Sequence, residues 1–354
     1  AAGDPAENAN DFHVMLPGHV GWASPTTTRF AWWAMPTLHL EFSRPMVTQH
    51  SLARTCWTLR IVLAVQCVGL AMQLLWGEYE TEADVYGWLF FGLGWAEEMA
   101  LRIEDIGTVA YFAAGLSILV LPLLGRISSA KSSRWDQLLV GLQILCLIWI
   151  ALWQGTHSML HAWRGGSFMA EWAVAAHAVR IFTPLALIAF LLARTQSKPV
   201  GGLVVMGDWI LRLAVAATFI MHGVEAIRLN PAFVDLLIGS ANNLLGWAMS
   251  QSTATIMLYV IGVIDVVLAM VLLARRWRSV AGYLAFWGMV TACSRVTAAG
   301  MVGFAAAYPE TLIRAANGGA PLALCILYFG LAAQRRAAAQ PVLPAESEGL
   351  SHAS

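Results

Sequence analysis

The residues in this chain that are best suited to chemistry are polar side chains inside long apolar stretches. His222 and Glu225 are three residues apart, so they share one face of a helix. Asp265, Arg295 and Asn317 lie in or beside three later apolar stretches. Ionisable groups within a membrane are costly, which makes them functional candidates by default. Four of them, His222, Glu225, Arg295 and Asn317, predict one polar layer that binds a ligand, hydrogen-bonds a quinone carbonyl or relays a proton. Asp265, expected nearer mid-membrane, is a separate ligand-binding candidate.

A structural role explains the same residues as well. A buried hydrogen-bonded network fixes the register of neighbouring helices, and an uncompensated charge in lipid would be unstable. Asp265 taken alone is also explained by an ion pair with an arginine. The sequence leaves both interpretations open, a ligand site and a network that only holds the helices together.

Two further histidines, His157 and His161, have the four-residue spacing of a metal-binding or haem-facing pair on a helix. No adjacent carboxylate motif such as HExxH accompanies them, and a position at the membrane interface explains them equally well. We therefore expect no metal, with these two residues as the weak candidates. The cofactor is unknown from the sequence, and a quinone or another bound lipophile is the one suggested.

An acidic segment lies earlier in the chain. It contains four carboxylates and one arginine: Glu97, Glu98, Arg102, Glu104 and Asp105. We interpret it as a solvated surface, and the alternative is a docking surface for a basic partner protein.

Composition indicates the medium in which these residues work. Hydrophobic residues make up 58% of the 354 positions and charged residues 12%, about half the charged fraction of a soluble domain. The bilayer is therefore the expected solvent. A net charge of zero argues against nucleic acid as a partner. The chain contains no P-loop, dinucleotide fingerprint or zinc-protease motif, which disfavours ATP-driven transport and soluble-type hydrolysis.

The sequence predicts an all-α integral membrane protein with eight transmembrane helices, since eight apolar runs approach the length of about 20 residues that a spanning helix needs. They lie at about 57–76, 107–125, 137–155, 173–193, 209–228, 254–274, 277–295 and 313–334. Arginines and lysines follow the second, fourth, sixth and eighth runs, whereas carboxylates follow the first. By the positive-inside rule both termini are cytoplasmic, in a bacterial-type inner membrane.

The eight runs divide into two copies of a four-helix unit. Short matches recur in order about 150 residues apart. They include Leu59-Arg60-Ile61 with Leu211-Arg212-Leu213, Gly94-Trp95-Ala96 with Gly246-Trp247-Ala248, and Gly115 with Gly262. An even number of spans per copy gives both copies the same orientation, so we expect two parallel-related bundles. We also expect a short interfacial helix before each Gly-Trp-Ala.

These copies define the domain organisation that we predict. A cytoplasmic or interfacial arm covers 1–52, the first repeat covers 53–196, the second covers 205–336, and a disordered tail covers 337–354.

The second copy resembles the DoxX-like membrane family. The resemblance is carried by Leu211-Arg212-Leu213-Ala214, by Ile220-Met221-His222-Gly223-Val224-Glu225, by Gly262 with Asp265, and by Pro321-Leu322-Ala323-Leu324. It implies a four-helix bundle per unit. Relatives include a subunit of a thiosulfate:quinone oxidoreductase and scaffolds of oxidoreductase complexes, and fold-level analogy does not transfer a reaction.

The first copy departs from this pattern at its polar positions. Leu70 stands where the second copy has His222, and Gln73 stands where it has Glu225. We therefore expect the first copy to have lost whatever chemistry the polar set performs.

Three functions remain as expectations. The first is a non-catalytic multi-pass subunit that anchors or assembles a larger membrane complex, with lipid and other protein subunits as partners. The alternative is a quinone- or lipophile-binding subunit of an oxidoreductase that uses the layer of His222 and Glu225. The third is a small-molecule transporter. The absence of cofactor-ligand motifs favours no catalytic activity of its own.

Overall fold

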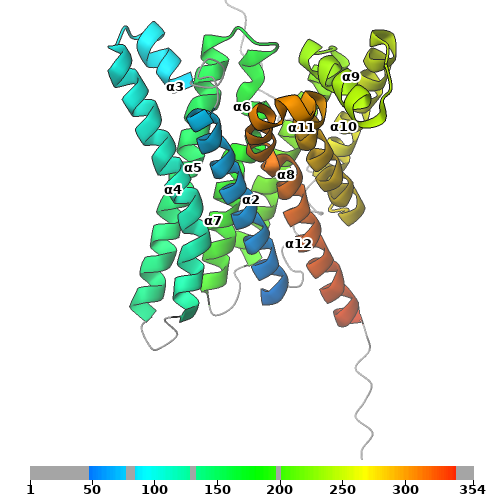
Figure 1. The fold of residues 1–354 in the computed structure, drawn as a ribbon. Helices are drawn as coiled ribbons and strands as arrows, with labels where there is room; N and C mark the ends of the chain where they lie inside the picture. Colours follow the sequence, from blue (N-terminus) through cyan, green and yellow to red (C-terminus); the bar gives the residue numbers. More distant parts are fainter. Residues whose placement is uncertain (1–47, 77–83, 128–132, 197–200, 340–354) are drawn as a thin grey trace, which may run out of the picture. The chain divides into compact units, whose positions relative to one another are not determined.

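The structure is a computed structural model that describes residues 48–76, 84–127, 133–196 and 201–339 (Figure 1). The chain divides into two units at residues 43 and 44, and every described helix belongs to the second unit. Most of the predicted arm, 1–52, and most of the predicted tail, 337–354, lie outside the described residues. The first described helix begins at Gln49 and the last ends at Ala339.

Every regular element within those described ranges is helical, as the sequence predicts. The longer helices are α2 (Gln49–Trp76), α4 (Glu97–Ile127), α5 (Ser133–Arg164), α7 (Ala178–Thr195), α8 (Gly201–Ile227), α9 (Pro231–Leu245), α10 (Gln251–Ala274), α11 (Arg278–Ile313) and α12 (Ala315–Ala339). The short ones are α3 (Asp84–Gly87), η1 (Trp88–Gly92), η2 (Ala170–Trp172) and α6 (Ala173–Ala176).

Seven segments among the described residues are long and apolar enough to cross a membrane. The seventh, Arg278–Gln334, runs through both α11 and α12 and covers the last two predicted spans, 277–295 except its first residue and 313–334. Inside α11 the backbone departs from helical geometry at Gly300, where φ is 63°, a value that glycine tolerates without steric cost. The chain therefore has the helices of a multi-pass membrane protein.

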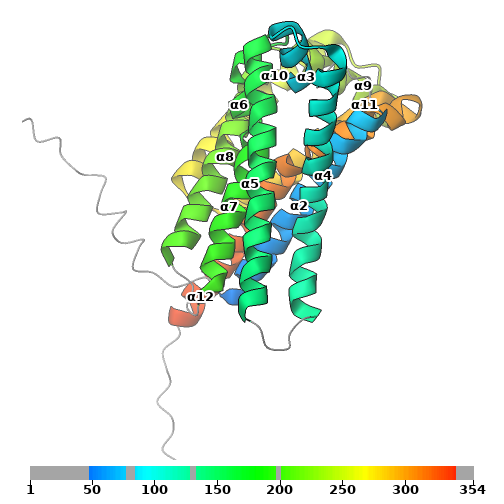
Figure 2. The same ribbon diagram turned by 90° about the vertical axis from the view of Figure 1, so that its left-hand side faces the viewer.

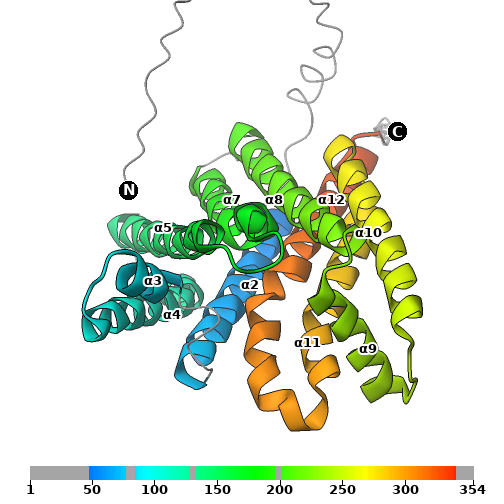
Figure 3. The ribbon, with the colours of Figure 1, turned by 90° about the horizontal axis from the view of Figure 1, so that it is seen from above.

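The helices pack in two comparable sets (Figures 2 and 3). In the first set α2 contacts α4, α4 contacts α5, α5 contacts α7, and α7 returns to α2. In the second set α8 contacts α10, α10 contacts α11, α11 contacts α12, and α12 returns to α8. Between the sets, α2 packs against α11 and α12, and α7 packs against α8.

Glycine allows the helices that carry the candidate residues to approach closely. A methyl group at Gly262 of α10 would lie 2.5 Å from the carbonyl oxygen of Gly223 of α8. Such backbone contacts are typical of small residues at helix interfaces within membranes. At the matching position of the first copy, a methyl group at Gly115 would lie 2.4 Å from the Cβ of Cys67. In each copy, therefore, a glycine allows close helix packing: Gly115 of α4 against α2, and Gly262 of α10 against α8.

Other features also recur at matched positions. The guanidinium of Arg60 lies 5.2 Å from the centre of the Trp57 ring, and that of Arg212 lies 4.3 Å from Trp209. Each Gly-Trp-Ala follows a helical segment, α3 and η1 in the first copy and the 15-residue α9 in the second, so a helix lies before each motif as predicted. Their location at a membrane interface stays a prediction. Gly94 and Gly246 both have a positive φ, 68° and 61°, which explains glycine at both positions.

Candidate functional site

A cavity of about 450 Å³ lies among α8, α9, α10, α11 and α12. Four of the five residues singled out from the sequence line it: His222, Asp265, Arg295 and Asn317. The fifth, Glu225, does not line the cavity, but it is hydrogen-bonded to His222, which does. Most of the remaining lining is apolar and comes from Leu, Ile, Val, Phe and Met side chains. This combination of apolar walls and a few convergent polar groups is typical of small-molecule sites.

The histidine–glutamate pair is oriented by one turn of α8. Nδ1 of His222 lies 2.8 Å from Oε2 of Glu225. When the carboxylate is ionised it only accepts hydrogen bonds, and Nδ1–H is then the donor of this contact. In a neutral imidazole this leaves Nε2 as an acceptor for a ligand. The ring of His222 also meets that of Phe233 of α9 edge to face, with 6.0 Å between ring centres.

Asp265 is the most unusual group in the cavity. Its side chain is 5% exposed, and its Oδ1 makes no hydrogen bond. The indole of Trp287 is its polar neighbour, and Trp287 lines the same cavity. No arginine of the described residues forms an ion pair with Asp265, in contrast to the structural alternative raised by the sequence. The indole Nε1 of Trp287 also lacks a well-formed hydrogen bond, so an acceptor and a donor both remain open to a ligand at this point of the cavity.

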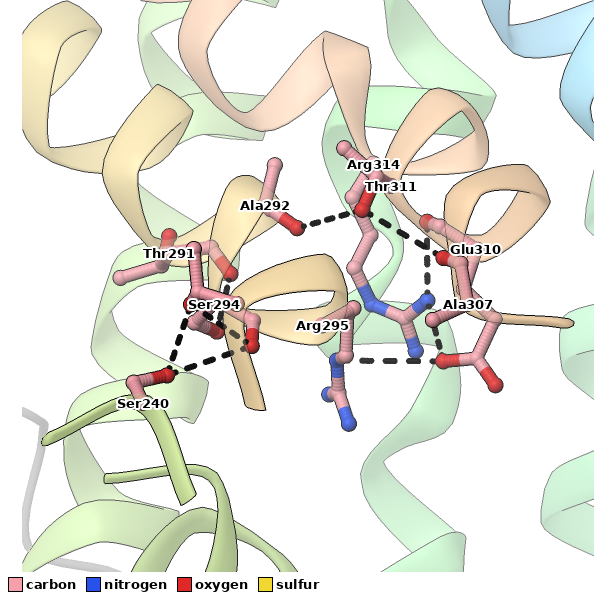
Figure 4. Close-up of polar contacts among 10 residues, drawn as sticks. Ser240, Thr291, Ala292, Ser294, Arg295, Ala307, Glu310, Thr311 and Arg314 are labelled. Carbon is pink, nitrogen blue, oxygen red and sulfur yellow. Dashed lines mark hydrogen bonds and ion pairs between the residues drawn. The ribbon is translucent and has the colours of Figure 1, made fainter. Parts of the chain in front are cut away.

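Arg295 and Arg314 line the cavity and form ion pairs with the same carboxylate, that of Glu310 (Figure 4). Oε2 of Glu310 lies 3.2 Å from Nη1 of Arg314 and 3.8 Å from Nε of Arg295. Glu310 reaches Arg295 because α11 turns at Gly300. Asn317, at the start of α12, is 6% exposed, and its Oδ1 has no hydrogen-bond partner.

The helix α9 closes one wall of the cavity by polar contacts with α11. Oγ of Ser240 lies 2.8 Å from Oγ1 of Thr297. It also lies 3.4 Å from the carbonyl oxygen of Ser294 (Figure 4). Nδ2 of Asn243 donates to the carbonyls of Thr297 and Ala298 at 3.1 and 2.7 Å. These bonds hold α9 against α11 just before its break at Gly300.

Sequence reasoning missed three features: the ion pairs of Glu310, the place of Arg314 in the cavity lining, and the contribution of α9. The four-residue spacing from Glu310 to Arg314 was a signal for their pairing. Nothing in the sequence indicated that Ser240 and Asn243 contact the residues before Gly300, since they are more than 50 positions away.

In the first copy, the interpretation of the acidic segment as a solvated surface is wrong for Glu104. Its side chain is 0% exposed, and it accepts a hydrogen bond from the backbone N–H of Tyr86 at 2.8 Å. Its Oε1 lies 3.0 Å from Nε2 of His157. Glu104 lies two turns inside α4, where it faces α3 and α5. The other members of the segment that we predicted to be solvated are exposed: Glu97, Glu98, Arg102 and Asp105.

The two histidines considered for metal binding have separate partners. His157 faces Glu104, whereas His161 lies 3.4 Å from Oδ1 of Asp84 and 2.8 Å from Oγ of Ser167. Asp84 also forms an ion pair with Arg164 at 2.8 Å. Within the ranges that the structure describes, no group of three His, Cys, Asp or Glu residues could hold a metal ion.

The first copy also contains a buried polar chain that the sequence did not suggest. Nε2 of Gln66 donates to the hydroxyl of Tyr111 at 2.6 Å, and that hydroxyl donates to Gln154 at 3.3 Å. The three residues come from α2, α4 and α5. The first copy thus has Leu70 and Gln73 in place of His222 and Glu225, but it contains a buried hydrogen-bonded chain of its own.

Comparisons with protein families, with curated proteins and with solved structures give no match to this chain. The geometry of the cavity therefore carries the functional argument.

Proposed function

We propose that this protein binds, within the membrane, an apolar molecule with a hydroxyl-bearing head group, of which a hydroquinone, the reduced form of a quinone, is the prime example. The observation that carries the proposal is the cavity of about 450 Å³, where oxygens of Asp265 and Asn317 are buried without partners. A site built to hydrogen-bond a hydroxyl or amine leaves such oxygens unsatisfied when it is empty. A subunit that only anchors a complex would not need this cavity.

In this proposal the second copy is the binding unit of an eight-span protein. The spans are α2, α4, α5 and α7 in one bundle, and α8, α10, the part of α11 before Gly300, and α12 in the other. The matched helix contacts, the paired Trp–Arg contacts and the matched glycines support two parallel copies. The DoxX-like resemblance of the second copy agrees with this arrangement. We place both termini in the cytoplasm of a bacterial-type inner membrane, on the basis of the positive-inside rule.

The role of each residue follows from its partners. Nε2 of His222 faces the head group as an acceptor while Glu225 holds the ring, and Asp265 with Asn317 offers further acceptors. Arg295 and Arg314 supply donors for a head-group oxygen. The apolar walls take the tail. We assign the chain binding and positioning, and electron transfer to or from the ligand belongs to a partner subunit.

Substitution His222→Ala tests the proposal. Lipid extracts of protein purified from native membranes should contain one apolar redox-active molecule at near-stoichiometric amount. Its retention should fall about twofold to tenfold in His222→Ala, which removes one hydrogen bond. His161→Ala is the matched control because His161 lies in the first copy, and it should retain the molecule fully.

Equal retention by wild type and His222→Ala would contradict the assignment of this cavity. A stoichiometric set of partner proteins in the wild-type preparation, without any bound lipophile, would favour the anchoring function instead.

A further inference from the structure

A second cavity, of about 390 Å³, lies at the opposite end of the α11–α12 pair from the candidate site. The connection from α10 to α11 forms one side and the second half of α12 forms the other. Its lining consists of Arg276, Trp277, Arg278, Ser279, Tyr328, Leu331 and Ala332. Nothing in the proposed function uses these residues, and the inference below is independent of it.

The charges around this cavity do not cancel. Asp208 of α8 is the carboxylate of the group, and it forms ion pairs with Arg276 at 2.8 Å and with Arg212 at 3.8 Å. Arg278 is exposed and makes no ion pair with any residue that the structure describes. Its guanidinium lies 5.0 Å from the centre of the Phe329 ring. Among the residues that the structure describes around this cavity, three guanidinium groups accompany one carboxylate, and this positive excess attracts an anion.

Hydrogen-bond donors add to this charge. Ser279 contributes a hydroxyl, and the first turn of the 36-residue helix α11 presents backbone N–H groups beside it. Tyr328 is 3% exposed, lines the cavity, and its hydroxyl lies near Asp208 without a well-formed hydrogen bond. Guanidinium, hydroxyl and N–H donors that line one cavity match the oxygens of a phosphate group.

The position of the cavity suits a lipid head group. It lies between the end of α10 at Ala274 and the start of α11 at Arg278, where two candidate membrane segments meet. Trp277 is exposed at this level, as expected for a residue at the membrane interface. Leu331 and Ala332 of α12 provide an apolar side along which an acyl chain can lie. From these observations we propose that this cavity binds a phosphate group, either that of an anionic phospholipid or free phosphate.

The first copy provides an internal comparison. Its Arg134-Trp135-Asp136 matches Arg276-Trp277-Arg278 of the second copy, so a carboxylate stands where Arg278 supplies the excess positive charge. The site is therefore specific to the second copy, so each chain has one such site.

The test uses the full chain reconstituted in phosphatidylcholine nanodiscs that contain a minor fraction of phosphatidylglycerol. After limited delipidation, mass spectrometry counts the lipids that remain on each protein. Wild type should retain one phosphatidylglycerol in preference to phosphatidylcholine, and Arg278→Gln should lower this preference about fivefold. Arg275→Gln is the matched control, because Arg275 is the exposed neighbour that does not line the cavity. It should behave as wild type.

Further measurements separate the outcomes. Arg278→Lys, which keeps the charge, should restore most of the preference, and thermal unfolding should show that Arg278→Gln is folded. Stabilisation of lipid-free protein by inorganic phosphate, dependent on Arg278 and without selective lipid retention, would assign the site to free phosphate. Equal losses in Arg275→Gln and Arg278→Gln would overturn the proposal, as would equal retention of both lipids by wild type without any phosphate effect.

Discussion

Substitution Asp265→Ala should lower the affinity of the α8–α12 cavity for its ligand by about tenfold to a hundredfold, the range for a lost hydrogen bond to a charged group. Asp265 is the buried carboxylate of the cavity, and its Oδ1 makes no hydrogen bond within the described structure. A hydroxyl-bearing head group would supply the missing donor. The measurement is equilibrium binding of a short-tailed hydroquinone to the purified full chain.

The matched control is Asp235→Ala. Asp235 is exposed on α9 and does not line the cavity, so the substitution removes the same group without touching the site. Its affinity should equal that of wild type. Because removal of an unpartnered buried carboxylate relieves a desolvation cost, Asp265→Ala should be at least as stable as wild type. An unchanged affinity in a folded Asp265→Ala protein would mean that this carboxylate does not face the ligand.

The second large effect concerns stability. Asp208→Ala is expected to destabilise the protein by about 3–5 kcal/mol, because it leaves buried guanidinium groups without their carboxylate. Asp208 is 2% exposed, and its Oδ2 accepts a hydrogen bond from Nε of Arg276 at 2.8 Å. Arg212 also donates to the carbonyls of Leu272 and Leu273, near the end of α10. Asp208 thus links α8 to the connection between α10 and α11.

Thermal and denaturant unfolding of detergent-purified protein would measure this change. Asp105→Ala is the comparison, because Asp105 is exposed on α4, and it should cost much less. If Asp208→Ala and Asp105→Ala unfolded alike, the ion pairs of Asp208 would contribute nothing measurable to the fold.

The sequence was sufficient for the features that depend on local pattern. Apolar runs predicted the helical membrane segments, since a spanning segment must satisfy its backbone hydrogen bonds internally. The recurrence of Gly94-Trp95-Ala96 at Gly246-Trp247-Ala248 predicted a short helix before each motif, and both helices are present. His222 and Glu225 pair as their three-residue spacing indicated.

Features that depend on which helices are neighbours were not accessible in this way. Glu104 reads as part of an acidic surface because Glu97, Glu98 and Asp105 flank it, and only the packing of α4 against α5 buries it beside His157. The turn at Gly300, which carries Glu310 back to Arg295, has no strong signal in a glycine-rich and alanine-rich segment. Helix contacts across long sequence separations decide both positions.

Photolabelling of the protein in native membranes tests the central claim most directly. The probe is a hydroquinone analogue with a photoreactive group on its head ring, and the sites of attachment are read by peptide mass spectrometry. The cavity predicts attachment to the segments that contain His222, Asp265 and Arg295, and an excess of unlabelled hydroquinone should abolish it. Attachment scattered over the lipid-facing residues of all helices, and unaffected by that excess, would contradict a binding site in the second half of the chain.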